Sequence, residues 1–264
     1  MKDSQAKRPK KYVKKSDVFA LGQHMLVCGD STSHNVLKSI PKEWKIKLIL
    51  TDPPYGVDYI GSKVGFEQFD HSHRSIENDH VQNDETYRKF TANWLNVVKE
   101  KLSEKNSFYI FNSDKMIFSL REALDSHNFK FSQLLIWVKN TSIIGRLDYQ
   151  PQHELIAYGW HGKHEFLKSK DKSVILYPKT KKNDLHPTMK PLGLLRRLIL
   201  NSSTIGDIIY DPFGGSGSTL IACEQTKRRC LMVELDPLYC EVIIDRFKKT
   251  SKEEVKLLTN KVDE

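Results

Sequence analysis

The feature that most constrains the fold lies between Asp207 and Asp236. There a strand, a glycine-rich turn, a helix and a second strand follow one another. The first strand, DIIY, leads into the turn DPFGGSGST, and the second strand ends at Glu234. Two strands joined through a helix form a βαβ unit, and glycines in its first turn let the backbone approach a ligand closely. We therefore expect an α/β protein with a ligand-binding turn at the end of a strand.

The spacing within this unit narrows the class of ligand. Glu234 follows Asp211 by 23 residues, the position from which a carboxylate binds the ribose hydroxyls in nucleotide-binding α/β sheets. The glycines do not follow GxGxxG, which disfavours a dinucleotide, and GGSGST lacks the lysine of a P-loop, which disfavours a triphosphate. An adenosyl ligand without phosphates fits better than either. A purely structural glycine turn is the alternative.

Strands and helices alternate along the rest of the chain, as in a largely parallel sheet with helices on both faces. We expect strands at 45–51, 107–111, 131–138, 207–210 and 230–234, and helices at 85–102, 115–124, 192–200, 218–225 and 237–248. Two segments interrupt the alternation: 56–84 is polar and rich in histidine and is expected to be a mobile loop, and 140–185 is expected to be an insertion.

A second motif, TDPPYG at residues 51–56, directly follows the predicted buried strand KIKLIL. Open α/β sheets bind their ligands at the carboxyl ends of strands. Asp52 offers a carboxylate acceptor, two prolines fix the direction of the Pro53 carbonyl, and Tyr55 offers a flat ring. Two acceptors and a stacking ring suit a planar amine such as that of a nucleobase. A rigid turn that happens to contain an aspartate is the alternative.

Taken together and in this order, TDPPYG and DPFGGSGST resemble the β-class of S-adenosylmethionine-dependent DNA (adenine-N6) methyltransferases, within the amino-group DNA methyltransferase family. Three further segments resemble the same family: LVCGDS at 26–31, IWVK at 136–139 and HPTMKP at 186–191. The resemblance spans about residues 20–248. It implies a permuted Rossmann-like methyltransferase fold, with a mostly parallel seven-stranded sheet, helices on both faces and a short inserted target recognition region.

The resemblance assigns roles residue by residue. A flipped base is expected to be bound and activated by a catalytic set of Asp52, Pro53 and Tyr55, with Pro54 shaping the turn. S-adenosyl-L-methionine is expected as the cofactor, held by Asp30 at the adenine, Glu234 at the ribose, Asp211 at the methionine amino group, the loop residues Phe213, Gly214, Gly215, Ser216 and Gly217, and His186, Thr188 and Lys190 on the far side. The alternatives are a surface lysine at Lys190 and a turn carboxylate at Asp30.

Charge supports a polyanionic partner, which the resemblance identifies as double-stranded DNA. The chain has 42 Lys and Arg against 33 Asp and Glu, a formal charge of +9. Two segments carry the excess of positive charge, 1–15 with net +6 and 139–182 with net +5. Basic segments of this kind typically bind phosphates. We expect 1–15 to be a disordered basic tail and 16–264 a single methyltransferase domain. Within that domain, 140–185 is the expected target recognition region, with Arg146 as a candidate base reader. A solvated, solubilising tail is the alternative.

Several other classes of protein are disfavoured. No stretch approaches the roughly 18 apolar residues of a membrane-spanning helix, and the lysine-rich start does not resemble a secretory signal, so a cytoplasmic location and no membrane partner are expected. Four cysteines without a CxxC pair give no zinc or disulfide framework. His71, His73 and His80 lack metal-ligand spacing, so no metal is expected. The family adds a homodimer and a cognate restriction endonuclease as candidate partners.

Three rival functions stay open. Cytosine-N4 methylation of DNA uses the same chemistry, although those enzymes more often carry serine in place of Asp52. An RNA or protein amine methyltransferase with a related NPPY motif usually places its cofactor loop first, whereas here TDPPYG precedes DPFGGSGST. A non-catalytic DNA-binding module would not need both motifs and Glu234 together. We expect transfer of a methyl group to the N6 amine of a flipped adenine.

Overall fold

The computed structural model describes residues 13–54, 83–142, 148–167, 171–179 and 189–258. Its strands are β1 (Val18–Leu21), β2 (His24–Cys28), β3 (Ile46–Thr51), β4 (Leu102–Asn112), β5 (Phe129–Val138), β6 (His153–His161), β7 (Lys163–His164), β8 (Val174–Leu176), β9 (Ile208–Asp211), β10 (Arg229–Glu234) and β11 (Val255–Leu258). Its helices are α1 (Asn35–Lys38), α2 (Asp84–Lys99), α3 (Ile117–Ser126), α4 (Leu192–Ser202), α5 (Ser218–Thr226) and α6 (Pro237–Thr250).

All these strands belong to one sheet, in the order β11-β1-β2-β10-β9-β3-β4-β6-β5-β8, with β7 paired to β4. The neighbours β2, β10, β9, β3 and β4 are parallel, whereas β6 runs antiparallel to both β4 and β5. This confirms the α/β fold with a large, mostly parallel sheet. β3 lies beside β9, so the strand that precedes TDPPYG and the strand that precedes the glycine loop are neighbours despite their separation in sequence.

The sheet is wider than the seven strands we expected. Seven strands, from β2 to β5 in the order above, form its middle, and β1, β7, β8 and β11 bring the described total to eleven. The four additional strands are two to four residues long. Such short strands carry too few residues for a period-two pattern to stand out, which is why the sequence did not reveal them.

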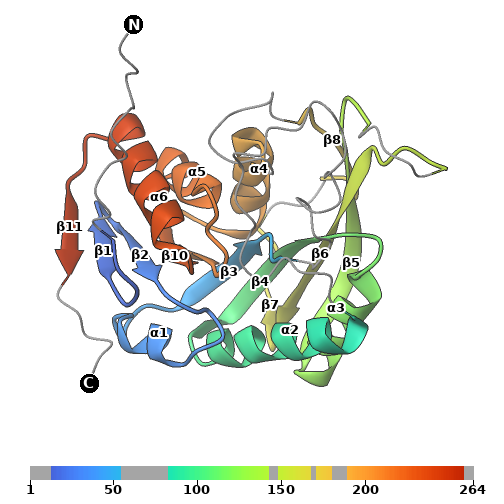
Figure 1. Cartoon of the computed structure of the whole chain (residues 1–264). Coiled ribbons are helices and arrows are strands. Elements are labelled where there is room, and N and C mark those ends of the chain that lie inside the picture. Colours follow the sequence, from blue (N-terminus) through green and yellow to red (C-terminus); the bar gives the residue numbers. More distant parts are fainter. Residues whose placement is uncertain (1–12, 55–82, 143–147, 168–170, 180–188, 259–264) are drawn as a thin grey trace, which may run out of the picture.

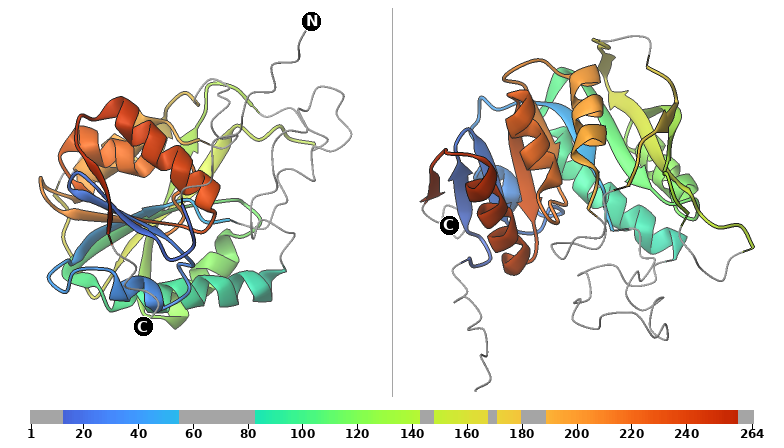
Figure 2. Two further views of the ribbon diagram at one scale, coloured as in Figure 1. Left: turned by 60° about the vertical axis from the view of Figure 1, so that its left-hand side comes forward. Right: turned by 90° about the horizontal axis from the view of Figure 1, so that it is seen from above.

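Helices cover both faces of the sheet, as Figure 1 and Figure 2 show: α1, α2 and α3 lie on one face, and α4, α5 and α6 on the other. Each face has its own hydrophobic core. Trp94 of α2 and Leu120 of α3 belong to one core, and Leu198 of α4, Cys223 of α5 and Phe247 of α6 to the other. Removing apolar side chains from water on both faces is the main force that holds the sheet between its helices.

Local sequence explains where the two longest helices begin. The side chain of Asn83 caps α2 by accepting a hydrogen bond from Thr86 N at 2.8 Å. Asp236 caps α6 through Leu238 N, also at 2.8 Å, and Pro237 occupies the first turn. A cap of this kind stabilises a helix by about 1 kcal/mol. Because Asp236 lies two residues beyond Glu234, the cap also fixes the end of β10.

The boundaries of three expected segments change. The expected insertion 140–185 contains β6, which lies in the sheet between β4 and β5, and the short strands β7 and β8, which also pair with the sheet; its role in target recognition stays a prediction. The expected loop 56–84 lies outside the described residues except for its last two, which begin α2. The last residues of the expected tail, 13–15, belong to the domain: Val13 is buried, and its N–H donates to Glu241.

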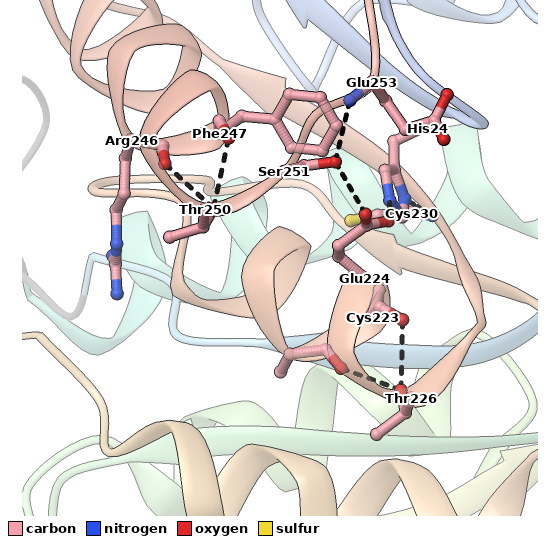
Figure 3. Close-up of polar contacts among 11 residues, drawn as sticks. His24, Cys223, Glu224, Thr226, Cys230, Arg246, Phe247, Thr250, Ser251 and Glu253 are labelled. Atoms are coloured by element: carbon pink, nitrogen blue, oxygen red, sulfur yellow. Dashed lines mark hydrogen bonds and ion pairs between the residues drawn. The ribbon is translucent and has the colours of Figure 1, made fainter.

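A buried polar cluster ties the sheet to α5 and α6 (Figure 3). His24, at the start of β2, accepts a hydrogen bond from Cys230 N on its Nδ1 at 2.9 Å and contacts Glu224 Oε2 through Nε2 at 2.9 Å. Ser251 Oγ donates to the other oxygen of Glu224 at 2.8 Å. Because Nδ1 accepts, the imidazole is neutral with its proton on Nε2. Burial lowers the pKa of His24 despite the neighbouring Glu224 carboxylate. Within the described residues, no helix is long and apolar enough to cross a membrane.

Candidate active site at the carboxyl ends of β3, β9 and β10

Three neighbouring parallel strands end at the same edge of the sheet, and each contributes a carboxylate there. Asp52 follows the last residue of β3, Asp211 ends β9 and Glu234 ends β10. The carboxyl edge of a parallel sheet is the usual ligand-binding edge of such folds. The fold therefore brings the residues of TDPPYG and DPFGGSGST, far apart in the sequence, to one place.

Asp211 lies beneath the glycine loop and is linked directly to the first motif. Thr51 Oγ1 donates to Asp211 Oδ1 at 2.8 Å, and Phe213 N donates to the same oxygen at 3.2 Å. Burial raises the pKa of Asp211 to about 7, although hydrogen bonds from Thr219 and Thr51 oppose the rise. The Thr51 contact joins the end of β3 to the end of β9 one residue before Asp52.

Glu234 is held rigidly by the backbone around it. Gly215 N donates to its Oε2 at 2.7 Å and Asp236 N to its Oε1 at 2.9 Å. Burial raises the pKa of the Glu234 carboxyl to about 7, against the effect of these two hydrogen bonds. The Glu234 carbonyl accepts from Gly29 N at 2.9 Å, which draws the end of β2 to the same edge.

The glycine loop can hold its shape only with glycine at particular positions. A Cβ on Gly214 would lie 2.7 Å from Met232 Cγ and 2.8 Å from its Sδ. Gly217 has φ of +78°, which side chains rarely adopt. Arg246 of α6 fixes the loop from outside, since its Nη1 donates to Ser216 O at 2.9 Å. These features make a tight, preorganised backbone.

Phe213 and Asp30 flank this loop. The Phe213 ring, half-buried, packs against two rings of α2, Phe90 at 5.5 Å and Trp94 at 5.9 Å between centroids. Asp30, after β2, is exposed, and its Oδ1 accepts from both the N–H and the hydroxyl of Thr32. Asp30 is thus a turn carboxylate in the chain alone, at the edge where the expected cofactor adenine would lie. The interpretation of Asp30 as a turn carboxylate is thus compatible with its expected contact with the cofactor adenine.

Asp52 belongs to a chain of four alternating charges. Its carboxylate forms an ion pair with Lys190, whose Nζ also lies 3.1 Å from Glu154 Oε2. The other oxygen of Glu154 lies 2.7 Å from Lys139 Nζ. The two lysine side chains are deeply buried, 9% and 6% exposed, whereas Asp52 and Glu154 are 25% and 23% exposed. Two partly exposed carboxylates therefore alternate with two buried ammonium groups.

Each group in this chain affects the ionisation of its neighbours. Burial disfavours the Lys190 ammonium, but Asp52 and Glu154 together raise the pKa of Lys190 above its usual value. Burial also disfavours the Glu154 carboxylate, yet the Lys190 and Lys139 ammonium groups lower its pKa. Lys190 and Glu154 are thus both charged at neutral pH. Lys190 is not the surface lysine of the alternative interpretation.

The structure brings together most, but not all, of the expected site residues. Pro53 is buried and Pro54 half-buried directly after β3, and the loop residues from Phe213 to Gly217 lie between Asp211 and Glu234 as expected. Lys190 contacts Asp52, and its expected place beside the cofactor stays a prediction. Tyr55, His186, Thr188 and Arg146 lie outside the described residues, as do His71, His73 and His80.

Sequence reasoning missed four residues of this region. Thr51 and Lys139 occur in the quoted motifs but received no role, and Glu154 and Arg246 were not considered. The only signal for Glu154 was a carboxylate in a strand that is otherwise apolar, since its partners come from distant segments. Among the described residues, no group of three or more His, Cys, Asp or Glu side chains is arranged to hold a metal ion.

Comparison with known proteins agrees with this geometry. The profile of the N6/N4 methyltransferase family, described as DNA methylase, matches residues 46–245. The type II methyltransferase M.HpaI of Haemophilus parainfluenzae is 26% identical over 246 residues, which is 84% of this chain and 73% of that protein. The 200 residues of 264 that the family profile matches include both motifs and the strands between them.

Two solved structures share the fold. The complex of M1.HpyAVI with SAM superposes with a TM-score of 0.61 at 22% identity, covering 84% of this chain and 98% of that one. The cytosine-N4-specific PvuII DNA methyltransferase superposes with a TM-score of 0.66 at 17% identity, covering 87% of each chain. From the family match and the site together, the chain belongs to the N6/N4 DNA methylase family and is a DNA amino-group methyltransferase.

Proposed function

We propose that this protein transfers a methyl group to the N6 amine of an adenine flipped out of duplex DNA. The observation that carries the proposal is the hydrogen bond of 2.8 Å between Thr51 Oγ1 and Asp211 Oδ1. It joins the motif that would bind the amine to the loop that would bind the cofactor. Asp52, one residue beyond Thr51, therefore lies beside the Asp211 end of the cofactor loop.

The cofactor is S-adenosylmethionine, which supplies an electrophilic methyl group when bound. The residues present fit this group. Glu234 is a half-buried carboxylate fixed by two backbone N–H groups, suited to accept from ribose hydroxyls. Gly214 packs so closely on Met232 that a Cβ there would displace the loop that would bind the cofactor. Asp211 offers a buried carboxylate for the cationic methionine end, which would favour its ionised form.

Asp52 and the Pro53 carbonyl would accept the two hydrogens of the adenine amine. The lone pair of that amine is delocalised into the ring, so it is a poor nucleophile, and two acceptors on its hydrogens favour the pyramidal form that frees it. Tyr55 is expected to stack on the base. The base must leave the duplex because its amine is inaccessible within the stack. Catalysis is then a matter of position and electrostatics, with no covalent enzyme intermediate.

Adenine is preferred over cytosine as the substrate because of Asp52. Cytosine-N4 enzymes more often carry serine at this position, and the sequence here is DPPY. The fold itself does not separate the two substrates, since the cytosine-N4-specific PvuII enzyme also superposes well. Cytosine-N4 methylation is therefore the second candidate. DNA is the partner implied by the family, while a homodimer and a cognate endonuclease stay predictions.

The experiment that tests the proposal identifies the modified base. Unmethylated genomic DNA is incubated with tritiated S-adenosylmethionine and the protein, digested to nucleosides, and separated with detection by mass. A Glu234→Ala variant, in which the ribose acceptor is lost, serves as the control for protein-dependent labelling. N6-methyldeoxyadenosine in the wild-type digest is the expected result. N4-methyldeoxycytidine alone would refute the adenine proposal in favour of the second candidate.

A further inference from the structure

The alternating chain of Asp52, Lys190, Glu154 and Lys139 contains a carboxylate that the proposed reaction does not use. Glu154 lies on β6, and Lys190 pairs with both Glu154 and Asp52. The side chain is 23% exposed, but its Oε2 atom is buried, and a charge removed from water is costly unless it is paired. Here both of its oxygens have an ammonium partner, at 3.1 Å and 2.7 Å. The arrangement is built rather than incidental.

Glu154 is on one of the most rigid elements available. β6 is paired on both sides, with Leu155 opposite Asn112 of β4 and Glu154 itself opposite Trp137 of β5. Lys190, in contrast, precedes α4 on a long, flexible side chain, and its Nζ lies 5.1 Å from the centre of the Phe111 ring. Glu154, held by the backbone of a paired strand, can therefore anchor the ammonium group of the longer Lys190 side chain.

We propose that Glu154 is a positioning residue for methyl transfer: it anchors the Lys190 ammonium, which in turn holds the Asp52 carboxylate in the orientation that accepts the amine hydrogens. The inference rests on the proposed function of Asp52. Without Glu154, Lys190 and the partly exposed Asp52 can swing together toward solvent as a pair. Lys139 has a different role, because it neutralises the second Glu154 oxygen, the one that does not face Lys190.

Three variants separate these roles: Glu154→Gln, Lys139→Gln and the double variant. Lys139→Gln keeps the Glu154–Lys190 contact, so its single-turnover rate is expected to lie closer to the wild-type rate than to that of Glu154→Gln, although one Glu154 oxygen loses its ammonium partner. Glu154→Gln is expected to be slower by about 10²-fold, the effect of a small misplacement of a reacting group. The double variant leaves one carboxylate and one ammonium, so it stays charge-balanced and folded even if Glu154→Gln does not. It is expected to be as slow as Glu154→Gln.

Glu224→Gln is the matched control. Glu224 of α5 is 23% exposed, as Glu154 is, and its two oxygens also have separate partners, His24 and Ser251. His24 begins β2, so it lies at the opposite end of this parallel strand from the site edge. The variant loses the same charge away from the site and is expected to keep the wild-type rate. A general effect of removing a partly buried, paired carboxylate would slow it as well.

Each variant is measured for S-adenosylmethionine affinity, thermal midpoint and single-turnover rate on unmethylated genomic DNA, scoring whichever base the wild type modifies. The expected result is a lower rate at unchanged cofactor affinity for both variants that lack Glu154. A double variant as fast as Lys139→Gln would overturn the proposal. A wild-type product of N4-methyldeoxycytidine would refute the adenine assignment alone, because the role of Glu154 is scored as a ratio of rates on the same amine.

Discussion

Cofactor binding should release protons, because two buried carboxyl groups in the site have a pKa of about 7 in the chain alone. These groups are Asp211 and Glu234, and burial is the main cause in both. A carboxyl group with this pKa is about half protonated at pH 7 and about nine-tenths protonated at pH 6. A cationic methionine end beside Asp211 and ribose hydroxyls on Glu234 both favour the carboxylate form.

The number of protons follows from these fractions. If binding ionises both groups, the protein releases about one proton per cofactor at pH 7 and about 1.8 at pH 6. The α-amino group of the cofactor stays mostly protonated in this range, since its reference pKa is about 7.7–8.0. The Asp211→Asn variant retains only Glu234 as a source, so its release should fall by about half at both pH values.

Isothermal titration calorimetry of S-adenosylmethionine binding is done in buffers of different ionisation enthalpy. The slope of the observed binding enthalpy against the buffer ionisation enthalpy gives the number of protons released. The account predicts a slope near one proton at pH 7, rising at pH 6. A slope near zero at both pH values would show that the two groups are already ionised before binding. That result would refute the reasoning from burial. A slope unchanged in Asp211→Asn would remove Asp211 from the cofactor site.

Two further predictions concern the scaffold. Gly214→Ala should lower the free energy of unfolding by about 1–3 kcal/mol and weaken cofactor binding, because the new Cβ would overlap Met232. Thermal melts and cofactor titrations test this, and wild-type values in both would contradict it. Gly29→Ala is the control for stability, because its Cβ meets only ordinary contacts. His24→Gln should cost about 1–3 kcal/mol at pH 8. Since the folded-state pKa of His24 is lowered, the wild-type advantage is present above pH 6.5 and should shrink as the pH falls below it; urea unfolding at pH 8 and pH 5.5 that shows a constant gap would refute this.

The parts of the fold that could be predicted from sequence are those with strong local patterns. The run KIKLIL and the helical spacing from Tyr87 to Val98 predicted β3 and α2 within one to three residues. The glycine loop and TDPPYG predicted the ligand-binding edge, because each directly follows a predicted strand and contains glycine or proline, which determine the local backbone conformation. β6 falls in the segment expected to be an insertion, because its place between β4 and β5 depends on pairing with distant strands.

The missing parts of the site depend on contacts between distant segments. Thr51 and Asp211 are 160 residues apart, and Lys190 meets Asp52 across 138 residues. Contacts between residues so far apart in the sequence cannot be predicted from local periodicity. The raised pKa values of Asp211 and Glu234 arise from burial, which a single sequence predicts only as an average tendency. Charged residues such as Glu154 are mostly exposed in proteins, so its burial could be found only in the folded structure.

We propose that Asp52 acts on the substrate amine and that cofactor affinity does not depend on its carboxylate. The most direct test compares Asp52→Asn with Asp114→Asn, a carboxamide change at an exposed position after β4, in single-turnover methyl transfer and cofactor titration. The account predicts that Asp52→Asn transfers methyl groups more slowly by about 10²–10³-fold, the usual cost of one lost electrostatic contact in a transition state. It also predicts that S-adenosylmethionine affinity stays within about threefold, and that Asp114→Asn matches the wild type. Transfer by Asp52→Asn at the wild-type rate would contradict the account.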